Sequence, residues 1–270
     1  MKQNPKVTVL MPAYNAEKYI GTAIESILNQ TYKDFEFIIV NDCSTDNTLR
    51  IINDYAKKDK RIRVISNKEN QKIAKTLNIG LKEAKGEYIA RMDADDWSYP
   101  DRLEKQVTFM EKNPNIVLSS GNMEICDSKL VYKNKSNLLL TNDVIRKNLL
   151  RFNPIVHPAM IYRKNEILQI NGYDVDAGAE DYMLVIDMSS LGDLANLPDT
   201  LIKYRVLDNS ITGSKMANLH IATLMCAFKA HLKYGYKIDF KTKVFHVGRL
   251  LTAYFFPSRI WRLISTRIKR

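Results

Sequence analysis

The first hundred residues alternate between short apolar runs and longer amphipathic segments. Four apolar runs have the length of buried strands, at residues 7–11, 35–40, 63–65 and 88–92. Between them, apolar residues recur every three or four positions, the spacing of one helical face, at residues 19–28, 49–55 and 73–84. This alternation predicts βαβ units, and therefore an α/β fold with a mostly parallel central sheet flanked by helices.

Local signals suggest where these helices begin and end. Asn15 is a good N-cap for the first helix, and Ser44 or Thr45 is a good N-cap for the second. Gly86 follows the third helix and is expected to close it.

The second half of the chain alternates less cleanly. The expected strands cover residues 115–120, 159–163 and 201–206, and the expected helices cover 98–110, 165–170 and 180–191. Pro100 suits the first turn of the helix that contains it, and Gly172 is a stop signal. Because there is no internal repeat or low-complexity linker, we expect this half to extend the same fold.

The end of the chain is strongly basic. Residues 221–270 contain 11 Lys and Arg and the single acid Asp239, a net charge of +10, whereas residues 1–220 carry only +1. A helix is expected over residues 214–234. Beyond it, apolar and aromatic residues oppose Lys and Arg, first up to Phe255 and then at Ile260, Trp261, Ile264 and Ile268.

Such a pattern is typical of a helix lying in an anionic membrane interface. Packing on the rest of the chain or on another protein is the alternative. Nucleic acid could also attract the charge, but no recognition motif accompanies it, so we expect no nucleic-acid partner.

Composition and cysteine content fit a cytoplasmic protein. A chain of 270 residues is long enough for one α/β domain with an appendage. The three cysteines form no CxxC pair, which argues against a disulfide framework or a zinc site. The start of the chain is polar, and the apolar run from Leu250 to Phe256 is too short to cross a bilayer.

The polar chemistry gathers where the first strands end. The polar residues there are 12–15, 41–46 and 93–96, and the carboxyl ends of parallel strands form the ligand edge of such a sheet. Asp93, Asp95 and Asp96 repel one another, and a divalent cation would relieve that repulsion because hard cations bind carboxylate oxygens. A solvated acidic turn without metal is the alternative. No GxGxxG or Walker A motif occurs, which weakens dinucleotide-binding and P-loop interpretations.

Four segments together resemble a family 2 glycosyltransferase of the GT-A type, whose fold is Rossmann-like. They are residues 9–15, 36–46, 86–96 and 178–182, and the similarity covers roughly residues 5 to 210. The resemblance implies transfer of a sugar from a nucleoside diphosphate donor to an acceptor hydroxyl, with inversion at the anomeric carbon.

The resemblance also implies roles for the acids at residues 93–96. Asp95 would ligate the metal directly, and Asp93 would contact the donor's ribose or a metal-bound water. The cation, Mn²⁺ or Mg²⁺, would stabilise the diphosphate leaving group electrostatically as its charge develops.

The donor's nucleotide has its own implied residues. Asp42 would bind the uracil or ribose of a UDP-sugar, with Pro12, Ala13 and Tyr14 lining the base pocket. A charge near the start of the next helix is the alternative for Asp42.

Lys75 and Asn78 lie where the donor-contacting helix of the family begins, but this pattern is looser. For Lys75, an exposed helix lysine remains the alternative.

Asp181 matches the family's catalytic aspartate, whose carboxylate acts as the base that takes the acceptor's proton. Together with Glu180 it could instead merely offset the dipole of the following helix. Glu180, His157 and Trp97 are candidates for the acceptor side.

The motif from Tyr204 to Leu207 departs from the family pattern. Related enzymes often read Tyr-Arg-x-His there, and leucine cannot bind metal. A third protein ligand is therefore absent, unnecessary, or supplied by His157 or His220.

The expected organisation is a catalytic domain over residues 1–212, followed by a helical, basic extension over 213–270. Within the domain, residues 1–97 would bind the nucleotide sugar and residues 98–212 the acceptor. The basic extension suggests a lipid-linked saccharide acceptor in surface polysaccharide synthesis, at the inner face of the cell membrane. A nucleotide-sugar-binding or nucleotidyltransferase-like protein without glycosyl transfer is the alternative.

Overall fold

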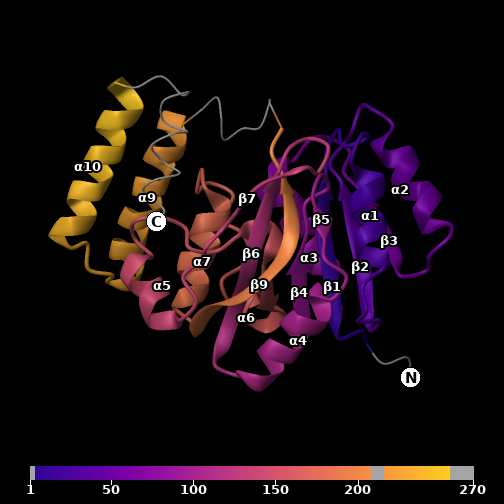
Figure 1. Cartoon of the computed structure of the whole chain (residues 1–270), viewed down its shortest axis with the longest axis horizontal. Helices are drawn as coiled ribbons and strands as arrows, with labels where there is room; N and C mark the ends of the chain where they lie inside the picture. Colours follow the sequence, from indigo (N-terminus) through magenta and orange to yellow (C-terminus); the bar gives the residue numbers. More distant parts are fainter. Residues whose placement is uncertain (1–3, 208–215, 256–270) are drawn as a thin grey trace.

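The computed structural model describes residues 4–207 and 216–255, with one central sheet between layers of helices (Figure 1). The strands are β1 (Val7–Ala13), β2 (Phe35–Asn41), β3 (Ile62–Ser66), β4 (Tyr88–Arg91), β5 (Trp97–Ser98), β6 (Ile116–Cys126), β7 (Tyr132–Lys135), β8 (Ile161–Arg163) and β9 (Asp193–Arg205). The helices are α1 (Ile20–Leu28), α2 (Thr48–Ala56), α3 (Lys72–Glu83), α4 (Arg102–Lys112), α5 (Asn142–Asn148), the 3₁₀ turn η1 (His157–Ala159), α6 (Lys164–Gln169), α7 (Glu180–Ser189), α9 (Met216–Tyr234) and α10 (Phe240–Phe255).

The strand order is β3-β2-β1-β4-β8-β6-β9-β5, and β7 pairs with β6. The first four strands are all parallel, whereas β8 runs antiparallel to both of its neighbours, β4 and β6. Beyond it, β9 is parallel to β6 and β5 is antiparallel to β9. The predicted α/β class with a central sheet flanked by helices is confirmed, and the parallel character is purest in the first half.

The sheet is covered on both faces because its strands are apolar on both sides. Val7, Val9 and Met11 of β1 pack into the core that contains α1, α2 and α4. Leu10, which points the opposite way, packs into the core that contains α3, α6 and α7. Continuous apolar runs such as β1 are therefore read correctly as buried parallel strands.

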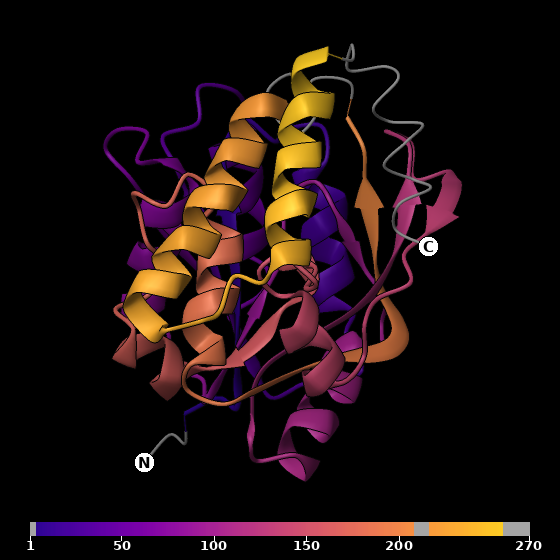
Figure 2. The same cartoon turned by 90° about the vertical axis from the view of Figure 1, so that its left-hand side faces the viewer.

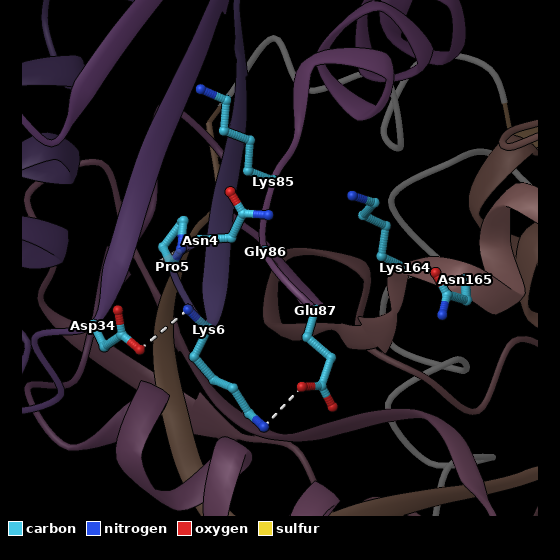
Figure 3. A pocket seen from close by; sticks show the side chains of 9 residues that line it. All are labelled: Asn4, Pro5, Lys6, Asp34, Lys85, Gly86, Glu87, Lys164 and Asn165. Carbon is cyan, nitrogen blue, oxygen red and sulfur yellow. Dashed lines mark hydrogen bonds and ion pairs between the residues drawn. The ribbon is translucent and has the colours of Figure 1, made fainter. Parts of the chain in front are cut away.

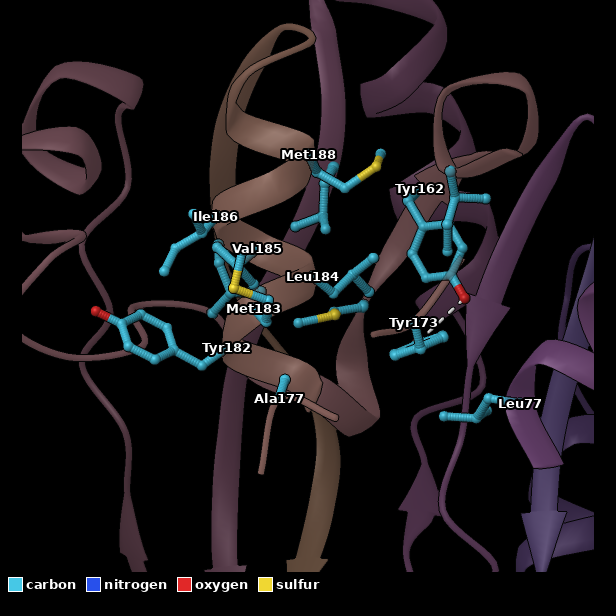
Figure 4. Close-up of a cluster of buried hydrophobic side chains, with 14 of the residues drawn as sticks. Leu77, Tyr162, Tyr173, Ala177, Tyr182, Met183, Leu184, Val185, Ile186 and Met188 are labelled. Atoms are coloured by element: carbon cyan, nitrogen blue, oxygen red, sulfur yellow. Dashed lines mark hydrogen bonds between the residues drawn. The ribbon is translucent and has the colours of Figure 1, made fainter. Parts of the chain in front are cut away.

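Helix α7 is buried along nearly its whole length. All residues from Tyr182 to Ser189 are buried, and Figure 4 shows their side chains spreading in several directions from the helix. Burying one large apolar side chain stabilises a fold by about 1.5–3 kcal/mol, so this helix is held by many such contributions. The residues at its first turn, Glu180 and Asp181, are consequently carried on a rigid element.

The first two helices begin later than the sequence predicts. Asn15 has φ +48° and is not an N-cap, because its side-chain oxygen accepts a hydrogen bond from the Thr45 N–H (2.8 Å). Its own N–H donates to Ser44 Oγ (3.1 Å). These residues therefore tie two loops together, and Asp46 rather than Ser44 or Thr45 accepts the Thr48 N–H at the start of α2 (2.9 Å).

Glycine occupies positions 172 and 86 for different structural reasons. Gly172 has φ +80° just after α6, as expected for a helix stop. Gly86 does not close α3, which ends at Glu83. A Cβ at Gly86 would lie 2.3 Å from the backbone nitrogen of Thr8, so glycine is needed there for close approach to β1.

Several elements of the second half differ from expectation. The helix expected from Ser98 begins at Arg102, because Trp97–Ser98 pairs with β9 as a short strand. Strand β7 and helix α5 were not predicted. All four residues of β7 are exposed, so it lacks the apolar alternation by which a strand is recognised, and α5 has only seven residues.

Helices α9 and α10 lie side by side on one end of the molecule (Figure 2). Cys226, Ala227 and Ala230 of α9 belong to the same core as α7, so the helical pair is packed onto the α/β part of the fold. Neither these helices nor any other within the described residues is long and apolar enough to cross a membrane. The basic and aromatic positions expected beyond Pro257 lie outside the described residues.

Candidate active site

The acidic residues lie at the edge of the sheet where the strand order reverses. The chain builds β1, β2 and β3 outward in one direction and then returns to place β4 on the other side of β1. The crevice outside the carboxyl ends at such a reversal is the usual ligand site of an open α/β sheet. Asp93 follows β4 there, while Pro12 and Ala13 end β1 and Asp42 follows β2.

Three carboxylates meet in the turn after β4. One oxygen from each of Asp93, Asp95 and Asp96 lies within 4.8 Å of the others, and this is the only such group of three metal-ligating residues in the described part of the chain. Neither His157 nor His220 joins it. Asp96 was visible in the sequence as a third acid, but only the fold turns its side chain toward the other two.

A buried arginine supports the cluster from below. Arg91 Nη1 lies 2.5 Å from Asp93 Oδ2, and only 2% of the Arg91 side chain is exposed. Arg102, also fully buried, donates from Nη2 to the Arg91 carbonyl oxygen (2.6 Å). Burial, together with the charge of nearby Arg91, lowers the pKa of Arg102 to about 9. Neither arginine is among the site residues expected from the sequence.

Arg205, at the end of β9, shapes the same turn. Its backbone N–H donates to Asp96 Oδ1 (2.8 Å), and its Nε donates to the Asp95 carbonyl oxygen (2.6 Å). The guanidinium also lies 4.5 Å from the centre of the Tyr19 ring. The arginine of the Tyr-Arg pair therefore holds the acidic turn in place, although Leu207 two residues later offers no ligand.

Burial makes the ionised form of the cluster costly. It raises the pKa of Asp95 to about 6, with a further contribution from the charge of Asp93. Burial and the two neighbouring carboxylates raise the pKa of Asp96 well above its ordinary value. Asp96 Oδ2 has no hydrogen-bond partner among the described residues. Three oxygen donors of this kind fit a hard divalent cation, which would favour the ionised carboxylates.

Asp42 is tied to the start of α3. Its carboxylate accepts hydrogen bonds from Asn67 Nδ2 (2.7 Å) and from the N–H groups of Gln71 (2.8 Å) and Lys72 (3.0 Å). A carboxylate offers about four acceptor positions, so about one remains for a ligand. The Asp42 carboxylate therefore bonds the start of α3, a contact that the sequence did not predict.

A depression lies beside the residues that bond Asp42. It is lined by Ile79 of α3 and by Asn67, Lys68, Glu69 and Gln71 of the loop before this helix. Of the expected base-pocket residues, Ala13 is buried, Pro12 is half-buried and Tyr14 is 51% exposed. These positions leave Tyr14 free to contact a ligand.

Lys75 and Asn78 occupy different environments on α3. Lys75 is exposed. Asn78 donates from Nδ2 to the Tyr173 carbonyl oxygen and accepts the Tyr173 N–H, both at 2.8 Å. Both ends of the Asn78 amide are therefore engaged in holding the loop that leads to α7.

Asp181 stands apart from the cluster at the first turn of α7. Asn153 Nδ2 donates to its Oδ2 (3.1 Å), and it forms no ion pair within the described residues. The Asp181 side chain is half-buried. Burial raises the pKa of Asp181, while hydrogen bonds from the Tyr182 N–H and Asn153 act in the opposite direction.

Glu180 connects the two acidic groups electrostatically. Burial raises the pKa of Glu180, and the charges of Asp181 and Asp93 raise it further, while Arg91 lowers it. The Arg91 charge also lowers the pKa of Asp181. The fold therefore brings the start of α7 within electrostatic reach of the acidic turn, although some 85 residues of chain separate them.

His157 is a packed, neutral residue. Its Nε2 lies 3.1 Å from the Tyr173 hydroxyl, which lies 3.2 Å from the Tyr162 hydroxyl (Figure 4). Burial and the charge of Arg91 lower the pKa of His157 well below its ordinary value. Trp97, in contrast, is half-buried on β5 and meets Tyr99 edge to face at 5.1 Å.

A pocket also lies at the opposite edge of the sheet, among residues that precede β1, β2 and β4 (Figure 3). Lys6 in this pocket is paired with Glu87 (2.8 Å) and Glu111 (3.1 Å). Its charge is thus already balanced, and the acidic turn lies at the other end of the strands.

Comparison with known proteins agrees with this geometry. The profile of the family described as "Glycosyl transferase family 2" matches residues 8–170. An uncharacterized glycosyltransferase of Haemophilus influenzae is 43% identical over 227 residues, covering 79% of this chain and 69% of that one. The amylovoran biosynthesis glycosyltransferase AmsE of Erwinia amylovora is 30% identical over 264 residues, covering 97% and 95%. Two further glycosyltransferases, from Bacillus subtilis and Haemophilus influenzae, match this chain over only 46% and 49% of their own length. The chain belongs to glycosyl transferase family 2.

Solved structures show the same fold. S. aureus TarS 1-349 in complex with UDP superposes with a TM-score of 0.66 and 22% identity, covering 93% of this chain and 72% of that one. The mannosyltransferase PcManGT from Pyrobaculum calidifontis, in complex with GDP-Man and Mn²⁺, superposes with a TM-score of 0.65 and 16% identity. The match covers 96% of this chain and 84% of that one. These likenesses establish the GT-A fold of the chain.

Proposed function

We propose that this glycosyltransferase moves a hexosyl or N-acetylhexosaminyl group from a UDP-sugar to an acceptor hydroxyl, with inversion and with a divalent cation, Mn²⁺ or Mg²⁺. The observation that carries the proposal is the division of acids at one sheet edge. Three carboxylates converge after β4, and Asp181, with Glu180 beside it, stands apart at the start of α7.

The acidic turn provides for the leaving group. Asp95, Asp93 and Asp96 would hold the cation, which would offset the charge that develops on the departing diphosphate. Arg91 and Arg205 orient two of these acids, so little reorganisation is needed as the sugar–phosphate bond breaks. Asp93 would also reach the donor's ribose.

Asp181 provides for the acceptor. Its carboxylate would accept the hydroxyl proton while the acceptor oxygen attacks the anomeric carbon from the face opposite the diphosphate. The new carbon–oxygen bond forms as the bond to the diphosphate breaks, which inverts the configuration. A raised pKa makes this carboxylate a stronger base than an exposed aspartate, and Asn153 fixes its direction.

The uridine would occupy the depression beside Asp42, with Pro12, Ala13 and Tyr14 along the base and Lys75 toward the phosphates. The complex of TarS with UDP supports a uridine nucleotide, whereas PcManGT was solved with GDP-Man. Asn78 would act indirectly, through the Tyr173 backbone that it bonds.

The acceptor would be a saccharide, in particular a lipid-linked one used for surface polysaccharide, at the inner face of the cell membrane. AmsE, similar to this chain along almost all its length, is named for amylovoran biosynthesis, which supports a polysaccharide product. Glu180, His157 and Trp97 would border the acceptor.

A panel of nucleotide sugars tests the proposal. We expect slow hydrolysis of one UDP-sugar in the presence of Mn²⁺ or Mg²⁺, faster turnover when an acceptor saccharide is added, and loss of both with EDTA. Turnover with a GDP-sugar alone would contradict the nucleotide assignment. Tight binding of a nucleotide sugar without any turnover would identify a binding protein instead of a transferase.

A further inference from the structure

Helices α9 and α10 each expose a stripe of large apolar side chains. The stripes share the spacing i, i+4, i+7 and i+11, and their members are 48–79% exposed: Ile221, Met225, Phe228 and Leu232 on α9, and Phe240, Val244, Val247 and Leu251 on α10. This spacing places each set of four on one face of its helix.

The exposed stripes are separate from the faces that pack on the protein. On α9, Cys226, Ala227 and Ala230 are buried in the core, and on α10 the inward positions include Thr242 and His246. The two helices lie against one another (Figure 2), and each stripe lies on the side of its helix away from these buried positions. Monomeric soluble proteins rarely expose large groups of apolar side chains unless they bind something.

Polar contacts hold the helical pair in a fixed orientation. On α9, Lys229 pairs with Asp174 (2.9 Å) and the Tyr234 hydroxyl donates to Asp187 (2.6 Å). On α10, His246 Nε2 lies 2.7 Å from the Leu150 carbonyl oxygen. The stripes are therefore presented by a rigid part of the fold.

The charge around the stripes is almost entirely positive. Residues 216–255 contain six Lys and Arg and one acid, Asp239, which is itself paired with Arg151. Lys237, Lys241 and Lys243 are exposed and form no ion pair within the described residues. Residues 256–270 add five Lys and Arg and no acid to the sequence.

We propose that the outer surface of α9 and α10 binds an anionic lipid bilayer, with the apolar stripes at the acyl boundary and the lysines among the headgroups. Apolar side chains combined with Lys and Arg suit such an interface. A second copy of the chain fits less well, because pairing two of these surfaces would bring like charges together.

The packed face of α9, opposite its exposed stripe, contacts the loop that leads to Asp181. Cys226 Sγ lies 3.8 Å from the Ala179 carbonyl oxygen, and a Cβ at Gly178 would lie 3.4 Å from Ala222 Cβ. Bilayer binding would thus hold the start of α7 near the lipid surface. That consequence rests on the proposed function, and it favours an acceptor carried by a membrane lipid.

Sedimentation of the full chain with vesicles tests the lipid assignment. Wild-type protein should pellet with vesicles of phosphatidylcholine and phosphatidylglycerol, less at high salt, and little with pure phosphatidylcholine. The variant Leu232→Ser/Val244→Ser/Leu251→Ser should lose most of this binding. As a control, Val131→Ser/Leu168→Ser removes exposed apolar side chains (53% and 45%) from other surfaces and should bind as wild type does.

Two charge-reversal variants test the electrostatic contribution to lipid binding. Each lysine near an anionic surface contributes about fivefold to binding, so Lys237→Glu/Lys241→Glu/Lys243→Glu should weaken it by about a hundredfold or more. The control Lys57→Glu/Lys58→Glu/Lys60→Glu makes the same charge change around the end of α2, at the opposite end of the molecule (Figure 1), and should have a much smaller effect.

Absence of pelleting with anionic vesicles, or equal pelleting of the stripe variant and wild type, would overturn the proposal. So would a wild-type dimer in light scattering that the stripe variant converts to monomer without any lipid binding. Donor hydrolysis in solution should be unchanged in the stripe variant. If lipid binding is found but no nucleotide sugar is turned over, the proposed function fails while the membrane surface stands.

Discussion

The two acidic groups of the site contrast in how their charge is balanced. In the turn after β4, the charge of Asp93 raises the pKa of Asp95, and the charges of both raise the pKa of Asp96. Of these three acids, only Asp93 is paired with Arg91. At the start of α7, Asp181 has a neutral partner, Asn153, and no ion pair among the described residues.

The contrast teaches how one sheet edge can divide two tasks among residues of the same type. Several carboxylates crowded together retain a need for positive charge, which a divalent cation would meet. One carboxylate that is buried but hydrogen-bonded is free to accept a proton. Mutations should therefore affect the two groups separately.

The largest effect is expected from Asp181→Asn. The amide cannot accept the acceptor's proton, so kcat for transfer should fall by about 10²–10⁴-fold, the usual contribution of a general base. The rise in thermal stability on adding Mn²⁺ should stay as in the wild type, because the acidic turn is intact. Glu180→Gln, one residue away, is the matched control and should lose far less. Loss of the Mn²⁺ effect in Asp181→Asn would show that the two groups are not separable.

Asp95→Asn should produce the opposite combination. Transfer should fall by about 10²–10³-fold, as expected when a group that stabilises the leaving charge is removed, and the Mn²⁺-dependent rise in Tm should disappear. EDTA should reduce wild-type activity by a similar factor. Asp143→Asn, at an exposed acid, should leave both measurements unchanged.

The same variant has a stability consequence without metal. Because burial raises the pKa of Asp95 to about 6, the folded protein binds this proton more tightly than the unfolded chain does. Its contribution to stability is therefore present at low pH and is lost as the pH rises through about 6. In EDTA at neutral pH, the free energy of unfolding of Asp95→Asn should exceed that of wild type by about 1–3 kcal/mol. This difference should vanish near pH 4. A lower stability at neutral pH would contradict the assigned repulsion.

The smallest effect is expected from Asn153→Ala. The Asn153 amide stabilises the ionised Asp181 and so lowers its pKa. In the variant, the pKa of Asp181 should therefore be higher. Because transfer needs the carboxylate, the acidic limb of the kcat profile should move to higher pH, with less than about a tenfold loss at neutral pH.

Asn153 also accepts the Ile155 N–H, so Tm must be compared alongside the pH profile. Asn134→Ala, on the exposed strand β7, is the control and should shift neither. An unchanged acidic limb in Asn153→Ala would mean that another group sets it.

The elements of the first half could be predicted because their signals are local. The apolar runs of β1 and β2 and the helical spacing of α3 are properties of consecutive residues, and the structure confirms them. Strand β7 has no such signal, since all its residues are exposed and only pairing with β6 makes it a strand. The N-caps expected at Asn15 and Ser44 failed because these side chains bond across two loops.

The site residues also fall into those that could be predicted from the sequence and those that could not. The acids at positions 93, 95 and 181 could be named from the motifs, since chemistry of that kind needs those residue types. Their surroundings could not: Arg91, Arg102 and Arg205 are ordinary basic residues in the sequence. Burial of Arg91 and Arg102 and the placement of Arg205 against the turn give them their roles.

The sequence by itself determined the family, the order of strands and helices in the first half, and the identity of the principal acids. Only the tertiary structure decided that Asp96 faces Asp93 and Asp95, that Asp42 ties down α3, and that α9 backs the loop before Asp181. The physical reason is that periodicity and motifs depend on neighbours along the chain. Burial, pKa and hydrogen bonding instead depend on neighbours in space, which here come from residues up to 110 positions away.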